Sequence, residues 1–299
     1  MADFTRKVDQ GLIDSLQTKD LFTECLRKDI ESGRIFFAIR PKRLSFYRMG
    51  RSLFNFDKNG FSAYSKFAFV PTQKEAYVTE AKLGAMHIET DFSKAYPKIL
   101  ERASLYADPE ALGVSNLYKF APCSKNTEER YFLVDIEVVF NSAKDTEEQD
   151  NEEELDDGKK ESKSDRIDIL LYDNHDRKLL FVEAKTFDNS EIWSARDVQP
   201  KVIDQLNKYD KQISNKKDSI LEQYTNAFAV YNQLLGVKLN APEDVCGRCG
   251  LLVFGFKQPQ LEKAQELRDR VISYKHKCRI IGGSSNLTAA SLFKEFAAQ

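Results

Sequence analysis

Three ionisable side chains inside apolar segments are the residues of this sequence best suited to catalysis. Asp168 lies in the run IDILL, and Glu183 and Lys185 lie in the run LLFVEAK. A charge in an apolar segment is costly unless something binds it. Carboxylate oxygens are hard ligands for Mg²⁺ or Mn²⁺, and the backbone carbonyl of Ala184 could add a third ligand. With Lys185 to neutralise charge on a phosphate, these residues predict metal-assisted phosphodiester hydrolysis.

Two strand-like segments on either side of residues 174–177 must bring these side chains together. The four residues between them are turn formers, which predicts a β-hairpin. A symmetric hairpin around this turn sets Asp168 opposite Glu183. Because side chains alternate along a strand, Glu183 and Lys185 would face the same side of the sheet. The alternative is that both acids are strand-end carboxylates, with Lys185 as a surface ion-pair partner.

This pattern resembles the signature of the PD-(D/E)XK nuclease superfamily. Asp168 is followed, fifteen residues later, by the Glu-x-Lys motif at 183–185. Twenty residues after Lys185, Gln205 and Tyr209 match the QxxxY element of the RecB-like branch. Their spacing of four places them on one face of a predicted helix, although an ordinary amphipathic helix would also contain such a pair. The resemblance covers roughly residues 131–282.

The resemblance implies a fold and an activity. The expected fold is α/β (α+β), with a restriction-endonuclease-like mixed central sheet flanked by helices. The expected activity is Mg²⁺- or Mn²⁺-dependent hydrolysis of DNA phosphodiester bonds. Asp168, Glu183 and the backbone carbonyl of Ala184 would hold the metal ion. The catalytic residues that the resemblance implies are Asp168, Glu183, Lys185, Gln205 and Tyr209.

Two questions about the site stay open from the sequence. Members of the superfamily often have a further acidic residue or histidine on a helix before the first core strand, but several acids fit here equally well. The alternative function is a catalytically inactive nucleic-acid-binding module of a defence or repair complex. The candidates for the further acidic residue are Glu101, Glu110, Glu128 and Glu129, and Glu137 within the first strand.

Five cysteines raise the question of a second metal centre. Cys246 and Cys249 have metal-ligand spacing, and His276 with Cys278 could complete a zinc site. Cys123, upstream of the other three, also makes the set similar to the iron–sulfur-bearing RecB-like nucleases, although the downstream spacing is much longer here. The third alternative is free thiols. Their odd number and irregular spacing are unlike the disulfide frameworks of small secreted domains.

The rest of the chain is expected to form two domains. Residues 1–92 contain a predicted helix at about 7–30 and an aromatic, β-branched meander at about 34–70. Residues 93–299 predict the nuclease-like domain, with core elements in the order α-β-β-β-α-α-β-α-β and a C-terminal helix. An acidic tract at about 145–165 has few apolar residues and predicts a disordered loop. Helices are predicted over 93–106, 200–214 and 218–235.

Basic side chains are frequent in the meander. Eight of them lie between Arg34 and Lys66, against the single acid Asp57. Interleaved aromatic residues make this pattern typical of a nucleic-acid-binding surface. The alternative is a solvated basic face whose aromatic residues form the core. The basic residues expected to contact phosphates are Arg40, Lys42, Arg43, Arg48 and Arg51.

Composition limits the class of protein. A chain of 299 residues that is 41% hydrophobic and 31% charged is expected to fold. No uncharged apolar run approaches the roughly 18 residues needed to cross a bilayer, and the segment MADFTRKVDQ lacks the apolar stretch of a signal peptide. We therefore expect an intracellular, cytoplasmic protein without a membrane partner. DNA is the expected partner, and a homo-oligomer or a larger complex is left open.

Overall fold

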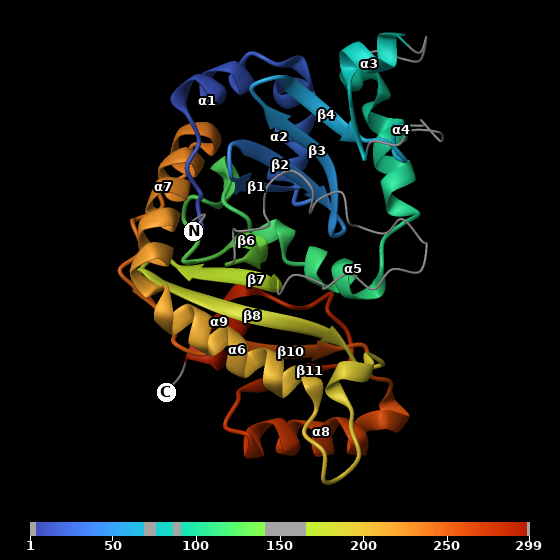
Figure 1. The fold of residues 1–299 in the computed structure, drawn as a ribbon, viewed down its shortest axis with the longest axis vertical. Helices are drawn as coiled ribbons and strands as arrows, with labels where there is room; N and C mark the ends of the chain where they lie inside the picture. Colours follow the sequence, from blue (N-terminus) through green and yellow to red (C-terminus); the bar gives the residue numbers. More distant parts are fainter. Residues whose placement is uncertain (1–3, 69–75, 86–90, 141–165, 298–299) are drawn as a thin grey trace. The chain divides into compact units, whose positions relative to one another are not determined.

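Two compact units make up the described chain, which comprises residues 4–68, 76–85, 91–140 and 166–297 of a computed structural model (Figure 1). The first unit extends to Asp108, and the second comprises Pro109 to Phe140 together with the chain from Arg166 onward. Within these ranges the chain forms two β-sheets and nine α-helices, which confirms the expected mixed α/β class. The acidic tract at about 145–165, expected as a disordered loop, lies outside the described residues.

An antiparallel five-stranded sheet forms the core of the first unit. Its strands follow one another in chain order, as a meander requires. Phenylalanines pack together inside it: the ring of Phe61 lies 5.9 Å from that of Phe46 and 6.2 Å from that of Phe54. The elements are β1 (Phe36–Arg40), β2 (Arg43–Arg48), β3 (Arg51–Asp57), β4 (Gly60–Tyr64), β5 (Tyr77–Thr79) and α3 (Glu80–Ala85).

The helical opening differs from the single helix expected at about 7–30. Helices α1 (Gln10–Gln17) and α2 (Arg27–Glu31) are separated by a π-helical turn (Leu21–Leu26). Leu16, the last buried residue of α1, and Leu21, the first buried residue of the π turn, are five positions apart. A period of 3.6 residues cannot keep such positions on one face, so the helix is interrupted and then continues with its buried face restored.

Helix α4 (Phe92–Ser104) belongs to the first unit. The expected domain boundary, between residues 92 and 93, assigned it to the second. The hydroxyl of Tyr96 donates a hydrogen bond to the buried carboxylate of Asp29 at 2.7 Å, and the ring of Phe92 lies 5.5 Å from that of Phe54 in β3. These contacts of its apolar face place α4 with the antiparallel sheet, and the division between the units follows Asp108.

A mixed sheet with the strand order β11-β10-β8-β7-β6 is the centre of the second unit. Strands β6, β7 and β8 are antiparallel to one another, whereas β10 and β11 run parallel to β8. β8 is therefore an interior strand, which explains its nearly continuous apolar sequence. The strands are β6 (Tyr131–Val139), β7 (Arg166–Asp173), β8 (Lys178–Thr186), β10 (Gly250–Phe254), β11 (Cys278–Ile281) and the short β9 (Asp244–Val245), which pairs with β8.

Helices flank this sheet, with α6 in front of it and α9 behind it in Figure 1. A Cβ atom on Gly250 would meet the ring of Phe296 at 2.7 Å, so α9 packs closely on one face of the sheet. Helices α6 and α7 begin and end within one residue of the expected positions, and Gly236 closes α7 in the left-handed conformation. The helices are α5 (Pro109–Ser115), α6 (Lys201–Asn215), α7 (Lys217–Leu235), α8 (Leu261–Ser273) and α9 (Ala289–Ala297).

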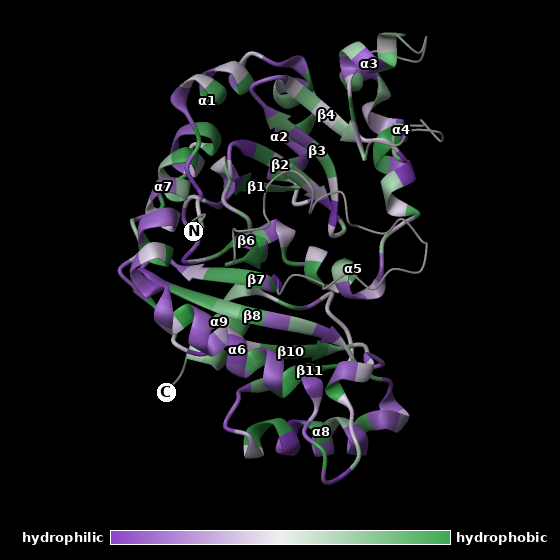
Figure 2. Ribbon diagram, viewed as in Figure 1, coloured by the Kyte–Doolittle hydropathy of each residue, from purple (hydrophilic) through white to green (hydrophobic). Residues whose placement is uncertain are grey.

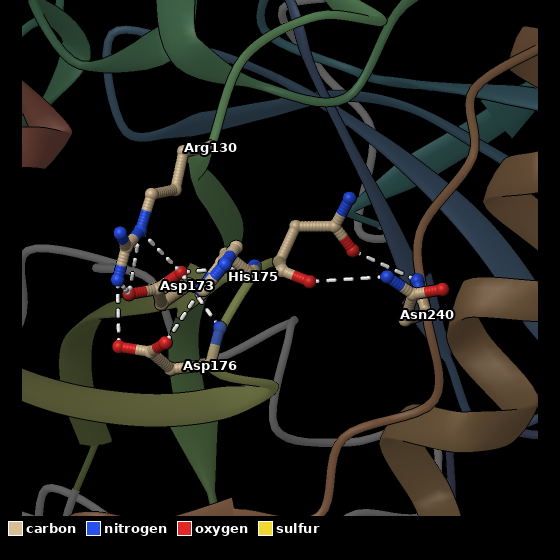
Figure 3. Close-up of polar contacts among 6 residues, drawn as sticks. Arg130, Asp173, His175, Asp176 and Asn240 are labelled. Carbon is tan, nitrogen blue, oxygen red and sulfur yellow. Dashed lines mark hydrogen bonds and ion pairs between the residues drawn. The ribbon is translucent and has the colours of Figure 1, made fainter.

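A polar network holds the turn between β7 and β8 (Figure 3). Asp173, only 1% exposed, accepts hydrogen bonds from the guanidinium of Arg130 at 2.7 to 3.0 Å. It also accepts from the backbone N–H groups of His175 at 3.0 Å and Asp176 at 3.1 Å. On the other side of the turn, the backbone N–H of Asn240 donates to the side-chain oxygen of Asn174 at 2.8 Å. The turn is thus fixed by both neighbouring segments.

The register of the β7–β8 hairpin agrees with the symmetric turn expected at residues 174–177. Ile169 pairs with Val182, and Tyr172 pairs with Leu179. Because a shift of one residue would reverse the face of every side chain, this register decides which residues of β8 share a side of the sheet with Asp168.

Candidate metal and phosphate site

Three acidic residues lie at neighbouring positions on three adjacent strands of the second sheet. The hairpin register, continued by one residue, sets Asp168 of β7 opposite Glu183 of β8. The backbone N–H of Ala184 donates to the Asp168 carboxylate at 2.7 Å, which joins the two strands at this point. On the other side of β7, Ile136 and Val138 of β6 pair with Ile169 and Ile167. Glu137, which lies between these two β6 residues, is therefore next to Asp168. The pairing therefore brings the two expected metal ligands together and adds Glu137 beside them.

Glu183 and Lys185 face the side of the sheet opposite to α9. Val182 pairs with Gly250, and Gly250 is the residue that approaches α9. Because side chains alternate along β8, Glu183 and Lys185 point the other way. Figure 2 shows the corresponding change in hydropathy: β8 is hydrophobic along its first part and hydrophilic residues appear toward its C-terminal end.

A buried ion pair forms the centre of this site. The Nζ atom of Lys185 lies 2.6 Å from Oε1 of Glu183, and the two side chains are 8% and 1% exposed. Oε2 of Glu183 is also buried, but among the described residues it has no hydrogen-bond partner. A buried carboxylate oxygen without a partner costs about 1–3 kcal/mol or more. Together with the half-buried Asp168, it has the chemistry of an incomplete ligand set for a hard cation.

The pKa values reflect the excess of acids. Burial, reinforced by the charges of Glu183 and Glu137, raises the pKa of Asp168 well above its ordinary value. Burial raises the pKa of Glu183 to about 7, although the charge of Lys185 opposes this change. Burial alone would lower the pKa of Lys185, but the neighbouring carboxylates, Glu183 first, raise it above its ordinary value. Lys185 therefore carries its charge at neutral pH, and a bound cation would favour the ionised form of both acids.

Glu110 joins the site from the first turn of α5. Its Oε2 atom accepts hydrogen bonds from the backbone N–H of Thr186 at 3.2 Å and from the side-chain amide of Asn189 at 3.3 Å. Its negative charge also raises the pKa of Asp168 and Glu183. Among the upstream acids offered by the sequence, Glu110 thus has direct contacts with the segment that follows Lys185.

Gln205 and Tyr209 contact each other on α6. The amide nitrogen of Gln205 donates to the Tyr209 hydroxyl at 2.8 Å, and this hydroxyl donates to the backbone carbonyl of Arg166 at 2.6 Å. Burial and the charges of Glu183 and Asp168 raise the pKa of Tyr209, so its hydroxyl stays a donor. The pair therefore holds the beginning of β7, two residues before Asp168, and the Gln205 amide donates to Tyr209 rather than to Glu183.

The candidates for a second metal centre are Cys123, Cys246, Cys249 and Cys278. In the described ranges, no three or more His, Cys, Asp or Glu side chains are grouped so that they could hold a metal ion. Burial raises the pKa of Cys249 well above its usual range and that of Cys278 to about 12. His276 instead hydrogen-bonds the side chain of Asn207 at 3.2 Å. The zinc, iron–sulfur and free-thiol alternatives therefore all stay predictions.

The basic meander of the first unit has a different organisation from the expected stacking surface. Arg40 is buried, with its guanidinium 5.3 Å from the centre of the Tyr47 ring. Arg48 donates to the hydroxyl of Ser104 at the end of α4, and Arg51 donates to the carbonyl of Tyr106 just beyond it. The stacking interpretation is wrong for the phenylalanines, because they form the core. Fully buried rings among them are Phe46, Phe54 and Phe56.

Lys42 and Lys58 are exposed basic residues in the β1–β2 and β3–β4 connections of this region. Lys42 follows β1 and Lys58 follows β3. In an antiparallel meander, the β1–β2 and β3–β4 connections occur at the same end of the sheet. The two lysines therefore occupy one end of the sheet, and they are available to contact an anionic partner.

Sequence reasoning missed one charged residue of the site. Glu191 lies in a short 3₁₀ turn (Ser190–Ile192) after β8, and its Oε2 atom is 3.4 Å from Nζ of Lys185. A useful signal was Asn189, whose side chain accepts a hydrogen bond from the Glu191 N–H, as a helix-capping residue does. For Glu110 the signal was Pro109, because proline favours the first position of a helix.

Comparisons with protein-family models, with curated proteins and with solved structures find no match for this chain. In the part of the chain that the structure describes, every helix is too short or too polar to cross a membrane. The functional assignment therefore depends on the arrangement of Asp168, Glu183 and Lys185 on β7 and β8.

Proposed function

We propose that this chain is a metal-dependent nuclease that hydrolyses DNA phosphodiester bonds with Asp168, Glu183 and Lys185 at its centre. In this proposal, the second unit has a restriction-endonuclease-like core of the PD-(D/E)XK type, in its RecB-like branch. The observation that carries the proposal is the unpartnered, buried Oε2 of Glu183 beside Asp168 and a charged lysine. Two neighbouring carboxylates repel each other, whereas a divalent cation would bind both of them and the lysine could bind a phosphate.

The metal-binding groups would be the carboxylates of Asp168 and Glu183 and the backbone carbonyl of Ala184. Only two of these ligands are acidic side chains. Glu110 of α5, whose charge acts on both of them, could add a further carboxylate. A Mg²⁺ or Mn²⁺ ion at this position would polarise a phosphoryl oxygen and make water a stronger acid. Zinc and an iron–sulfur cluster are not part of the proposed function.

Each protein group has a role that follows from its contacts. Lys185, fixed by Glu183, offers a permanent positive charge to the phosphate. Tyr209, with Gln205 behind it, holds the carbonyl of Arg166 and thereby the part of β7 that carries Asp168. Such supporting residues orient the groups that touch the metal without touching it themselves.

Element order adds support to the proposed fold. Three antiparallel strands (β6, β7, β8), a helical pair (α6, α7) and the parallel strand β10 follow one another along the chain. The motif residues lie on β7, β8 and α6, as the resemblance implies.

The test is cleavage of linear and supercoiled DNA by the purified full chain in Mg²⁺, beside the same reactions in EDTA. Lys185→Met removes the charge but keeps an apolar stem, and Lys178→Met, at the other end of β8, is the matched control. We expect cleavage by the wild type and by Lys178→Met only, and only with Mg²⁺. DNA binding without cleavage would favour the non-catalytic module instead.

A further inference from the structure

Among the described residues, Lys185 forms close ion pairs with two carboxylates of different kinds, Glu183 and Glu191. Glu183 is 1% exposed and lies 2.6 Å from Nζ, whereas Glu191 is 44% exposed and lies 3.4 Å from the same atom. The first contact is a short, buried, charge-assisted hydrogen bond. The second is longer and open to solvent, so it is the weaker of the two. An anion that approaches from solvent can therefore replace Glu191 on the ammonium, while the Glu183 contact stays intact.

The position of Glu191 is fixed by the turn that carries it. Its backbone N–H donates to the side chain of Asn189 at 2.9 Å, and the Asn189 amide donates to Glu110 at 3.3 Å. Ile192 is fully buried, and the indole N–H of Trp193 donates to the carbonyl of Phe187 at 2.8 Å. The turn is thus attached to the site on one side and to the apolar interior on the other. Glu191 is consequently held near Lys185 by the backbone, unlike a long surface side chain in an incidental ion pair.

We propose that Glu191 is the displaceable counter-ion of Lys185 and marks the place where the scissile phosphate binds. This inference rests on the proposed nuclease function. In the absence of nucleic acid, Glu191 balances the charge of Lys185 and occupies the solvent side of its ammonium. A phosphate oxygen takes that place when the substrate binds, and the Glu191 carboxylate returns to water.

The proposal has a direct electrostatic consequence for substrate binding. The Glu191 charge competes with phosphate for Lys185 and repels it, so removing this charge should tighten binding. The reaction itself uses Lys185 and the two metal-binding acids, all of which remain. Glu191→Gln should therefore lower KM about 3–10-fold and change kcat less than about 3-fold, as expected for one like charge removed from a partly solvated site.

The experiment measures kcat and KM for the full chain on a fluorescent DNA oligonucleotide in Mg²⁺. Glu191→Asp keeps the charge and should stay close to the wild type. Asp188→Asn removes a charge from an exposed residue of the same connection and should change KM less than about 2-fold. Equilibrium binding in Ca²⁺, which takes similar oxygen ligands in a looser geometry, should give the same order of affinities.

Three results would overturn the inference. An increase in KM, or a loss of kcat beyond 10-fold, in Glu191→Gln would show that Glu191 helps the reaction rather than competing with the substrate. Equal changes in Glu191→Gln and Asp188→Asn would show a general effect of charge. If the wild type neither binds nor cleaves nucleic acid, the proposed function fails and the inference fails with it, whereas the first two results would leave the nuclease function in place.

Discussion

Glu183 is the residue whose environment says most about the site. Its side chain is almost completely buried, one oxygen is bonded to Lys185 and the other has no partner among the described residues. Without a cation, this arrangement favours the protonated acid, which is why its pKa rises to about 7. The cost of ionising Glu183 in the folded protein should be measurable as a dependence of stability on pH.

We predict that Glu183→Gln removes a pH-dependent loss of stability in EDTA. In the wild type, the unfolded chain releases the Glu183 proton near pH 4.5, and the folded protein retains it to about pH 7. Ionisation therefore lowers the free energy of unfolding as pH rises from about 4.5 to 7, by at most about 3 kcal/mol. Urea denaturation of both proteins at pH 4.5 and 7.5 checks this. Parallel changes in the two proteins would contradict the burial argument.

A second prediction at this scale concerns Gln205. Its amide orients the Tyr209 hydroxyl, which holds the carbonyl of Arg166. Gln205→Ala should lower the cleavage rate about 10–100-fold, the range typical of lost supporting hydrogen bonds near a metal, while Mg²⁺ still binds more weakly. Gln212→Ala, an amide two turns further along α6, is the control. Equal cleavage rates for Gln205→Ala and the wild type would show that Gln205 does not support the catalytic residues.

The β7–β8 hairpin is the element that makes the site, because its register sets Asp168 opposite Glu183. Residues 174–177 allowed this register to be predicted, since a four-residue turn between two β-rich segments has one symmetric pairing. The helical opening could not be predicted as well, because its interruption depends on packing inside the first unit. Asn189 and Pro109 indicate the short turn of Glu191 and the helix start near Glu110, but the contacts of these acids with the site depend on the folded structure.

We predict that Asp173→Ala destabilises the hairpin at the end remote from the site. The change removes the bidentate bond with Arg130 and two backbone hydrogen bonds, and should lower the free energy of unfolding by about 2–3 kcal/mol. Asp176→Ala, at an exposed residue of the same network, should cost clearly less. Denaturant titration measures both. A smaller effect for Asp173→Ala than for Asp176→Ala would show that burial of Asp173 is not what stabilises the turn.

At the scale of the whole molecule, the pattern of strand-like and helical segments correctly predicted a mixed α/β fold. Helix α4 shows the limit of this reasoning. The sequence pattern predicted the helix itself, but its place in the first unit follows from tertiary contacts, those of Tyr96 with Asp29 and of Phe92 with Phe54. The basic meander shows the same limit. Its charges were visible in the sequence, whereas the burial of Arg40 required the fold.

We predict that the exposed end of the first sheet contributes to DNA affinity. Lys42→Glu with Lys58→Glu should weaken binding and reduce the slope of log Kd against log salt by about 2, one unit for each lost phosphate contact. The measurement is fluorescence anisotropy in Ca²⁺ at several salt concentrations. Arg40 is unsuitable for this test because its burial would confuse binding with folding. An unchanged affinity and slope would assign these lysines to an ordinary solvated surface.

If Asp168 binds the metal ion that the proposed nuclease uses, Asp168→Asn should lose Mg²⁺-dependent DNA cleavage. This substitution keeps the size of the side chain and removes the charge that a metal ion requires, so the fold should persist. Asp197→Asn, an exposed carboxylate in the connection between β8 and α6, is the matched control. We expect a rate at least about 100-fold below the wild type for Asp168→Asn, with unchanged circular dichroism, and a normal rate for the control. Cleavage by Asp168→Asn at the wild-type rate would contradict the proposed site.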